Sequence, residues 1–211
     1  GAAAATWIFR GGRCLRYRLW RDADARAFGL ENAAAFAAAR NEGARSDVLR
    51  YEVLWREGGV YADVDFDFLK PLDALCASAD AFVGFSHVGA VELNNGFLGA
   101  APGHGLMRAL VDGVAAARPP PPDPGLAAVA ASGFLDQSLA KLLADADAAW
   151  TIERTGPGLL TRVFCEGFLD APPRTVCLPF PLLYPVANDG GGAATEDSLA
   201  VHRWGKSWQT G

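Results

Sequence analysis

A helix followed by a strand that ends in aspartates constrains the fold of this chain more than any other feature. Apolar residues at helical spacing follow Ser46, a residue type that caps helices, and Gly58-Gly59 can end the helix in a left-handed turn. The segment 60–68 then predicts a short buried strand. A helix and a buried strand in this order are typical of an α/β protein.

Three aspartates occupy alternate positions of that strand: Asp63, Asp65 and Asp67. Period-two geometry places their carboxylates on one face, where mutual repulsion raises their pKa values unless a cation lies between them. Such hard oxygen ligands suit Mg²⁺ or Mn²⁺. The bare pattern is also found in exposed turns and in phosphatases whose first aspartate is a nucleophile, so it leaves these alternatives open.

The rest of the chain alternates between the two kinds of element. Helices are predicted over 23–40, 106–117, 135–144 and 158–168, and strands over 17–20, 81–85 and 97–100. The run 119–124 is a proline-rich connector. A length of 211 residues fits one domain, and the alternation favours an α/β fold with a central mixed sheet.

Composition excludes several classes of protein. A net charge of −5 argues against nucleic acid as a partner, because that binding needs clustered lysine and arginine. No window reaches the ~20 apolar residues of a membrane-spanning helix, so membrane association is expected only through segments absent from this chain. The four cysteines have no Cys-x-x-Cys spacing, which argues against a zinc ribbon or redox pair and leaves buried thiols or disulfides.

Five ordered blocks give the sequence a family resemblance. The first runs over 45–72 and includes Asp63-Val64-Asp65; the others are 94–100, 101–104, 155–158 and 202–208. This set resembles the DXD sugar-binding glycosyltransferases of family 32, which include the yeast-type initiating α-1,6-mannosyltransferase and the inositol phosphoceramide mannosyltransferases. The resemblance covers nearly the whole chain.

The resemblance implies a GT-A type, Rossmann-like fold: a single domain over residues 1–211, with the motifs in 17–208 and a mixed sheet flanked by helices. Family members usually begin with a strand of the type Ile-Pro-Lys-x-Ile-His-Gln, which helps to form the nucleotide pocket. No such segment precedes Trp7. We therefore expect the first strand to be missing, or to be replaced in part by Trp7-Ile8-Phe9.

The resemblance also implies a reaction. It predicts a metal-dependent transferase that moves a sugar, with mannose favoured, from a nucleotide-sugar donor to a glycan or glycolipid acceptor with retention. It favours GDP-mannose over a UDP-sugar as the donor, and it leaves open whether the acceptor is a glycan, a sphingolipid or another molecule. Similar enzymes work in the lumen of the Golgi and secretory pathway, anchored to the membrane.

The same resemblance implies the site residues. Asp63 and Asp65 bind Mn²⁺ or Mg²⁺ with His202 as a third ligand. Asp47 and Arg50, three residues apart on one helix face, approach the donor sugar. The residues expected around the nucleotide and diphosphate are Tyr61, Asn95, Ser207 and Trp208.

Two other functions remain open at this point. A phosphohydrolase would use Asp63 as its nucleophile and would not depend on a nucleotide-sugar. A non-catalytic relic of a glycosyltransferase would keep the fold and bind metal or carbohydrate weakly. The acids near the motif blocks that could assist an acceptor are Glu92, Asp136 and Glu153, and the sequence does not choose among them.

Overall fold

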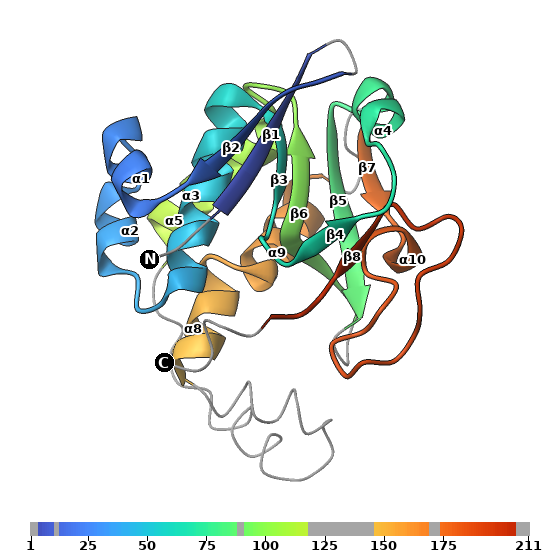
Figure 1. Ribbon diagram of the computed structural model, residues 1–211. Coiled ribbons are helices and arrows are strands. Elements are labelled where there is room, and N and C mark those ends of the chain that lie inside the picture. The colour runs from blue at the N-terminus through green and yellow to red at the C-terminus, as the bar shows by residue number, and fades with distance from the viewer. Residues whose placement is uncertain (1–3, 11–12, 88–90, 118–145, 169–173, 206–211) are drawn as a thin grey trace, which may run out of the picture.

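Two β-sheets form the centre of the computed structural model, which describes residues 4–10, 13–87, 91–117, 146–168 and 174–205 (Figure 1). The main sheet has six strands: β1 (Ala4–Arg10), β2 (Arg13–Trp20), β3 (Gly59–Ala62), β5 (Ala81–His87), β6 (Val91–Ala100) and β7 (Thr175–Leu178). The smaller sheet pairs β4 (Phe66–Phe68) with β8 (Ala200–His202).

Helices lie in some of the intervals between the strands. Those of the first half are α1 (Asp22–Phe28), α2 (Ala33–Ala38), α3 (Glu42–Glu57), α4 (Asp73–Ser78) and α5 (Gly105–Ala116). Those of the second half are α8 (Ala146–Arg154), α9 (Pro157–Gly167) and α10 (Phe180–Leu183). Within the described residues no helix is long and apolar enough to cross a membrane.

The main sheet is mixed, with the strand order β2-β1-β3-β6-β5-β7. β5 and β7 are parallel, and the other neighbours are antiparallel. Helices lie on both faces of this sheet (Figure 1). The predicted α/β class with a mixed sheet flanked by helices is confirmed, and the GT-A type stays a prediction.

Each face of the sheet has its own apolar core. Leu54 of α3, Leu110 of α5 and Leu160 of α9 are fully buried with strand residues such as Leu98 on one face. On the other face, Phe97 packs in a cluster with Leu183 and Tyr184 of the α10 region and with residues of β4 and β8. The candidate site lies where β3 leaves the large sheet and the small sheet begins.

The segment expected to stand in for part of a missing first strand does form a strand of the main sheet. Trp7-Ile8-Phe9 lies within β1, which sits between β2 and β3. Trp7 pairs with Val60, and the pairing is antiparallel. The strand 17–20, predicted at an edge, is the end of β2 and does lie at the edge of the sheet.

Two helix predictions need correction. The segment 23–40 forms two helices, because Gly29 adopts a left-handed conformation with φ of 69° and ends α1. Ser46 does not cap α3, since Asn41 precedes the helix and its side chain accepts a hydrogen bond from the Ala44 amide at 2.9 Å. Ser46 lies inside the helix, where its hydroxyl donates to the Gly43 carbonyl at 2.8 Å.

The strand predicted over 60–68 is interrupted. β3 ends at Ala62 and β4 begins at Phe66, so a turn separates them. The Asp63 amide donates to the Gly96 carbonyl at 2.8 Å, and the Phe66 amide donates to the Asp63 carbonyl at 3.2 Å. The three aspartates therefore do not share one strand face, and the expectation that they would is wrong.

Most other predicted elements are present with shifted ends. The expected helices at 106–117 and 158–168 correspond to α5 and α9, and the expected strands at 81–85 and 97–100 lie within β5 and β6. The connector 119–124 and the helix expected at 135–144 lie outside the described residues.

Candidate metal and donor site

The turn between β3 and β4 brings two carboxylates and one imidazole together. Asp63, Asp65 and His202 each offer a ligand atom, and these atoms lie within 4.8 Å of one another. His202 comes to the turn because β8 pairs with β4, with His202 opposite Phe66. The predicted metal-binding set is thus assembled from segments 137 positions apart in the chain.

His202 is held from several sides. Its ring stacks on the Phe66 ring with centroids 4.6 Å apart, and its centroid lies 4.4 Å from that of the Trp204 ring. Nε2 lies 3.1 Å from Oδ1 of Asp65, whereas Nδ1 is buried and has no hydrogen-bond partner among the described residues. An imidazole whose Nε2 lies beside Asp65, with Asp63 near by, fits a divalent cation such as Mn²⁺.

Asp65 is fixed by the backbone that follows β8. The Gly205 amide donates to Oδ2 of Asp65 at 2.6 Å, and the Arg203 amide donates to the Asp65 carbonyl at 2.9 Å. Burial alone would raise the pKa of Asp65, but the hydrogen bonds from His202 and Gly205 outweigh it and the pKa lies below its ordinary value. Asp65 is therefore an anion at neutral pH, as a metal ligand must be.

Asp67 does not belong to the site. Its side chain is half exposed and forms an ion pair with Arg203, which is itself exposed. The turn at Asp63-Val64-Asp65 changes the direction of the backbone, so Asp67 lies within β4. Its side chain therefore does not share a face with the other two acids, contrary to what had been expected. Only the first two aspartates converge.

Asp63 is bound to a buried arginine and a buried tyrosine. The Tyr61 hydroxyl donates to Oδ1 of Asp63 at 2.6 Å, and Nη2 of Arg50 lies 3.3 Å from the same oxygen. The Arg50 guanidinium also lies over the Tyr61 ring, 4.2 Å from its centroid. The position that a Cβ of Gly96 would occupy is 2.8 Å from Oδ2 of Asp63, so only glycine leaves room for this carboxylate.

Arg50 links Asp63 to Asp47, the other acid predicted at the donor. Nη2 of Arg50 lies 3.0 Å from Oδ1 of Asp47, and Nη1 donates to the Asn95 carbonyl at 2.6 Å. Asp47 and Arg50 are only 4% and 3% exposed, so most of their hydrogen-bonding capacity is used inside the protein. Arg50 contacts Asp63 directly and helps to orient it, whereas Asp47 is connected to Asp63 through Arg50.

Burial dominates the ionisation of this cluster. It raises the pKa of Asp47, with the charge of Arg50 opposing the shift, and it raises the pKa of Tyr61 well above its ordinary value. Burial alone would lower the pKa of Arg50, but acidic neighbours that include Asp63 outweigh it and the pKa is raised. Arg50 is therefore a permanent cation, and Tyr61 is a permanent hydrogen-bond donor.

The structure brings most of the predicted site together. Asn95 reaches Asp47 from β6, with its amide donating to Oδ1 at 2.8 Å. Ser207 and Trp208 lie outside the described residues, as does Asp136. The side chain of Glu153 is 54% exposed, whereas Glu92 is partly buried beside Ser86.

Two residues of the cluster were given no role by sequence reasoning. Tyr51 and Thr155 both contact the groups around Asp47: the Asn95 amide donates to the Tyr51 hydroxyl at 2.9 Å, and the Thr155 hydroxyl donates to Oδ2 of Asp47 at 2.8 Å. Tyr51 lies four residues after Asp47, and this spacing on a helix was a signal that could have identified it. Thr155 could not have been found from spacing alone.

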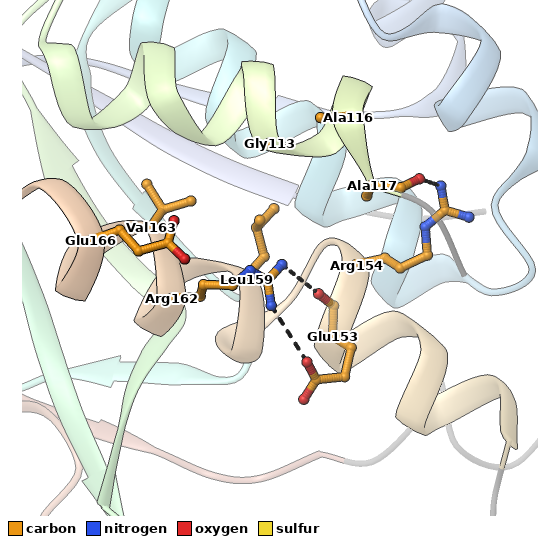
Figure 2. A pocket seen from close by; sticks show the side chains of 9 residues that line it. All are labelled: Gly113, Ala116, Ala117, Glu153, Arg154, Leu159, Arg162, Val163 and Glu166. Atoms are coloured by element: carbon orange, nitrogen blue, oxygen red, sulfur yellow. Dashed lines mark hydrogen bonds and ion pairs between the residues drawn. The ribbon is translucent and has the colours of Figure 1, made fainter. Parts of the chain in front are cut away.

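A hollow of about 390 Å³ lies elsewhere, between α5, α8 and α9 (Figure 2). Two arginines, two glutamates and small or apolar side chains line it. Arg162 pairs there with Glu153 at 3.5 Å, and Arg154 donates to the Ala117 carbonyl. None of the residues around the aspartate turn lines this hollow.

The segment that holds the aspartate turn also carries a similarity to known proteins. Residues 21–82 match the family described as "Glycosyltransferase sugar-binding region containing DXD motif". This match includes Asp47, Arg50, Tyr61, Asp63 and Asp65, and it does not extend to His202. It supports a glycosyltransferase and leaves the sugar, the donor and the acceptor undefined.

Other comparisons add little. A solved structure titled "PaToxG Glycosyltransferase" is 14% identical, with a TM-score of 0.40, over 70% of this chain and 45% of that one. The present chain thus spans less than half of the length of that structure. No curated protein matches the sequence.

Proposed function

We propose that this protein is a metal-dependent glycosyltransferase that uses a nucleotide-sugar donor. The observation that carries the proposal is the convergence of Asp63, Asp65 and His202, with Asp63 fixed by Arg50 and Tyr61. The match of residues 21–82 to the DXD sugar-binding region supports the same conclusion. Mannose from GDP-mannose, a glycan or glycolipid acceptor, retention, and work in the Golgi lumen complete the proposal and rest on the sequence resemblance.

The protein's own residues have distinct tasks in this proposal. Asp63, Asp65 and His202 would hold Mn²⁺ or Mg²⁺, which would neutralise the charge that develops on the leaving diphosphate. Tyr61 and Arg50 keep the Asp63 carboxylate in one orientation. Asp47 would accept a hydrogen bond from a donor-sugar hydroxyl, since its Oδ2 receives only the Thr155 hydroxyl within the described residues.

The phosphohydrolase alternative makes a different demand on Asp63. A nucleophilic carboxylate attacks phosphorus and becomes phosphorylated, whereas a metal ligand stays unmodified. Oδ1 of Asp63 accepts from Tyr61 and lies 3.3 Å from Nη2 of Arg50, and carboxylates that bind metals are commonly oriented by such hydrogen bonds. The relic hypothesis shares the set of two carboxylates and an imidazole, and it differs in predicting no turnover of a nucleotide-sugar.

An activity assay tests the proposal. The purified protein is incubated with GDP-mannose and with UDP-sugars, with and without Mn²⁺, and release of the nucleoside diphosphate is measured. We expect metal-dependent release, reduced at least about a hundredfold in Asp65→Asn, because loss of a charged metal ligand removes several kcal/mol of transition-state stabilisation. Asp67→Asn is the matched control and should retain the wild-type rate.

Three results would contradict the proposal. One is release that does not need metal, and another is equal loss of activity in both variants. The third is a phosphorylated Asp63 formed without any nucleotide-sugar, which would instead establish the phosphohydrolase.

A further inference from the structure

A closed ring of four hydrogen bonds lies beneath the aspartate turn. Thr155 donates to Oδ2 of Asp47 at 2.8 Å, and the Asn95 amide donates both to Oδ1 of Asp47 at 2.8 Å and to the Tyr51 hydroxyl at 2.9 Å. The Tyr51 hydroxyl closes the ring by donating to the Thr155 carbonyl at 2.6 Å. The ring joins α3, β6 and the junction between α8 and α9, and its members are almost completely buried.

Thr155 controls one side of the Asp47 carboxylate. Its single hydroxyl proton has two acceptors in reach: Oδ2 of Asp47 at 2.8 Å and the Thr151 carbonyl at 3.1 Å. The shorter, charge-assisted bond to Asp47 is the stronger one. Oδ1 of Asp47 is held by Asn95 and Arg50, and among the described residues Thr155 is the one that donates to Oδ2 and so completes the orientation of the carboxylate.

The orientation of the Asp47 carboxylate affects Asp63 through Arg50. Nη2 of Arg50 lies between the two acids, 3.0 Å from Asp47 and 3.3 Å from Asp63. Rotation of the Asp47 carboxylate about its Cβ–Cγ bond moves both the unused lone pair of Oδ2 and the contact of Oδ1 with Arg50. The group that fixes Oδ2 therefore also fixes the acceptor that a donor-sugar hydroxyl would meet.

We infer that Thr155 is a positioning residue, which acts through Asp47 and sets the affinity for the sugar part of the donor. This inference rests on the proposed function, because it presumes that a nucleotide-sugar occupies the site. It assigns Thr155 no contact with the metal or the diphosphate. The affinity for a nucleoside diphosphate without a sugar should then be nearly independent of Thr155.

The substitution Thr155→Val isolates this role. Valine has nearly the same shape as threonine and keeps the backbone carbonyl that accepts from Tyr51, so only the hydroxyl donated to Asp47 is lost. Thr155→Ser keeps that hydroxyl and should restore the wild-type behaviour. Thr161→Val is the matched control, since the Thr161 hydroxyl accepts from the Leu93 amide and takes no part in the ring.

Titration calorimetry with Mn²⁺ compares GDP with GDP-mannose, and UDP with UDP-sugars, on each folded variant. We expect Thr155→Val to weaken nucleotide-sugar binding about tenfold, the scale of one charge-assisted hydrogen bond, while the affinity for the matching nucleotide changes less than about twofold. Tyr51→Phe opens the ring from the other side and should weaken sugar binding about threefold.

The outcomes separate the inference from the proposed function. If the wild type shows no metal-dependent binding of any nucleotide-sugar, the proposed function fails and the inference with it. If the wild type binds but Thr155→Val changes both affinities equally, or changes neither, only the inference is overturned. Should Thr155→Val not fold, an unchanged ratio of the two affinities in Tyr51→Phe overturns it in the same way.

Discussion

At the scale of single residues, Glu92 is an acid whose ionisation the fold strongly disturbs. It lies on β6, where the Ser86 hydroxyl donates to its Oε1 at 3.3 Å. Burial, with a smaller contribution from Glu153, raises its pKa from 4.5 to about 7. Between pH 4.5 and about 7, the Glu92 carboxyl is therefore mostly protonated in the folded protein and mostly ionised in the unfolded chain.

This shift predicts a pH-dependent stability. Below pH 4.5 the carboxyl is protonated in both states, and as the pH rises from 4.5 to 7 only the unfolded state loses the proton. The unfolding free energy should therefore fall with rising pH, by about 3 kcal/mol in total, and Glu92→Gln should abolish this contribution. Urea unfolding of wild type and variant at pH 5 and pH 8 measures it.

The comparison has a clear control. Glu166→Gln removes an exposed acid from α9 and should not change the pH dependence. If Glu92→Gln and the wild type differed by the same free energy at both pH values, the raised pKa of Glu92 would be refuted.

Sequence reasoning at the residue scale succeeded where chemistry is local. Asp63 and Asp65 lie close together and meet His202, as the sequence suggested, whereas the bound cation stays a prediction. The same reasoning wrongly included Asp67, because alternation along a strand holds only while the strand continues, and here a turn intervenes. Thr155 was missed because its role depends on a contact across 108 positions of sequence.

At the scale of elements, the end of α3 sets where β3 begins. Gly58 adopts φ of 64°, and a Cβ placed there would lie 2.5 Å from Cδ of Pro102. Both observations explain why the helix ends at a glycine, as the sequence predicted, although ψ of −165° at Gly58 differs from the left-handed turn that was expected. The end of the helix in turn places β3 and its aspartate turn beside β6.

Replacement of this glycine should therefore be costly. Gly58→Ala combines a left-handed backbone with a collision against Pro102, and we expect it to lower the unfolding free energy by about 2–4 kcal/mol. Gly103→Ala is the matched control: φ is 74° there, but nothing lies within 4 Å of the added Cβ, so only the cost of the backbone, about 1 kcal/mol, should appear. Urea denaturation of both variants compares them, and equal losses would contradict the proposed collision.

The elements themselves were predictable to different degrees. α5 and α9 were identified because their apolar residues recur at helical spacing and form the core of one face. The start of α3 was misjudged, because Asn41 and Ser46 are both capping residue types and only the structure shows which one precedes the helix. The division of 23–40 depends on one left-handed glycine in an otherwise helical composition.

At the scale of the whole molecule, the site exists because distant segments meet. β4 pairs with β8 and places His202 opposite Phe66, while β6 places Asn95 and Gly96 against Asp47 and Asp63. Residue patterns can suggest the members of such a site but not the pairing that assembles them. The sequence likewise does not predict that β1 pairs with β3 in an antiparallel direction.

The central claim is that this assembly binds a nucleotide through a metal. Calorimetric titration of the wild type with GDP and with UDP, each with and without Mn²⁺, tests it most directly. The same titrations are made on Asp63→Ala/Asp65→Ala and on Asp67→Ala, and circular dichroism checks that both variants are folded. We predict that one nucleotide binds only with Mn²⁺, that the double variant weakens this binding at least about a hundredfold, and that Asp67→Ala leaves it unchanged. Metal-independent binding, wild-type affinity in the double variant, or no binding of either nucleotide by the folded wild type would contradict the claim.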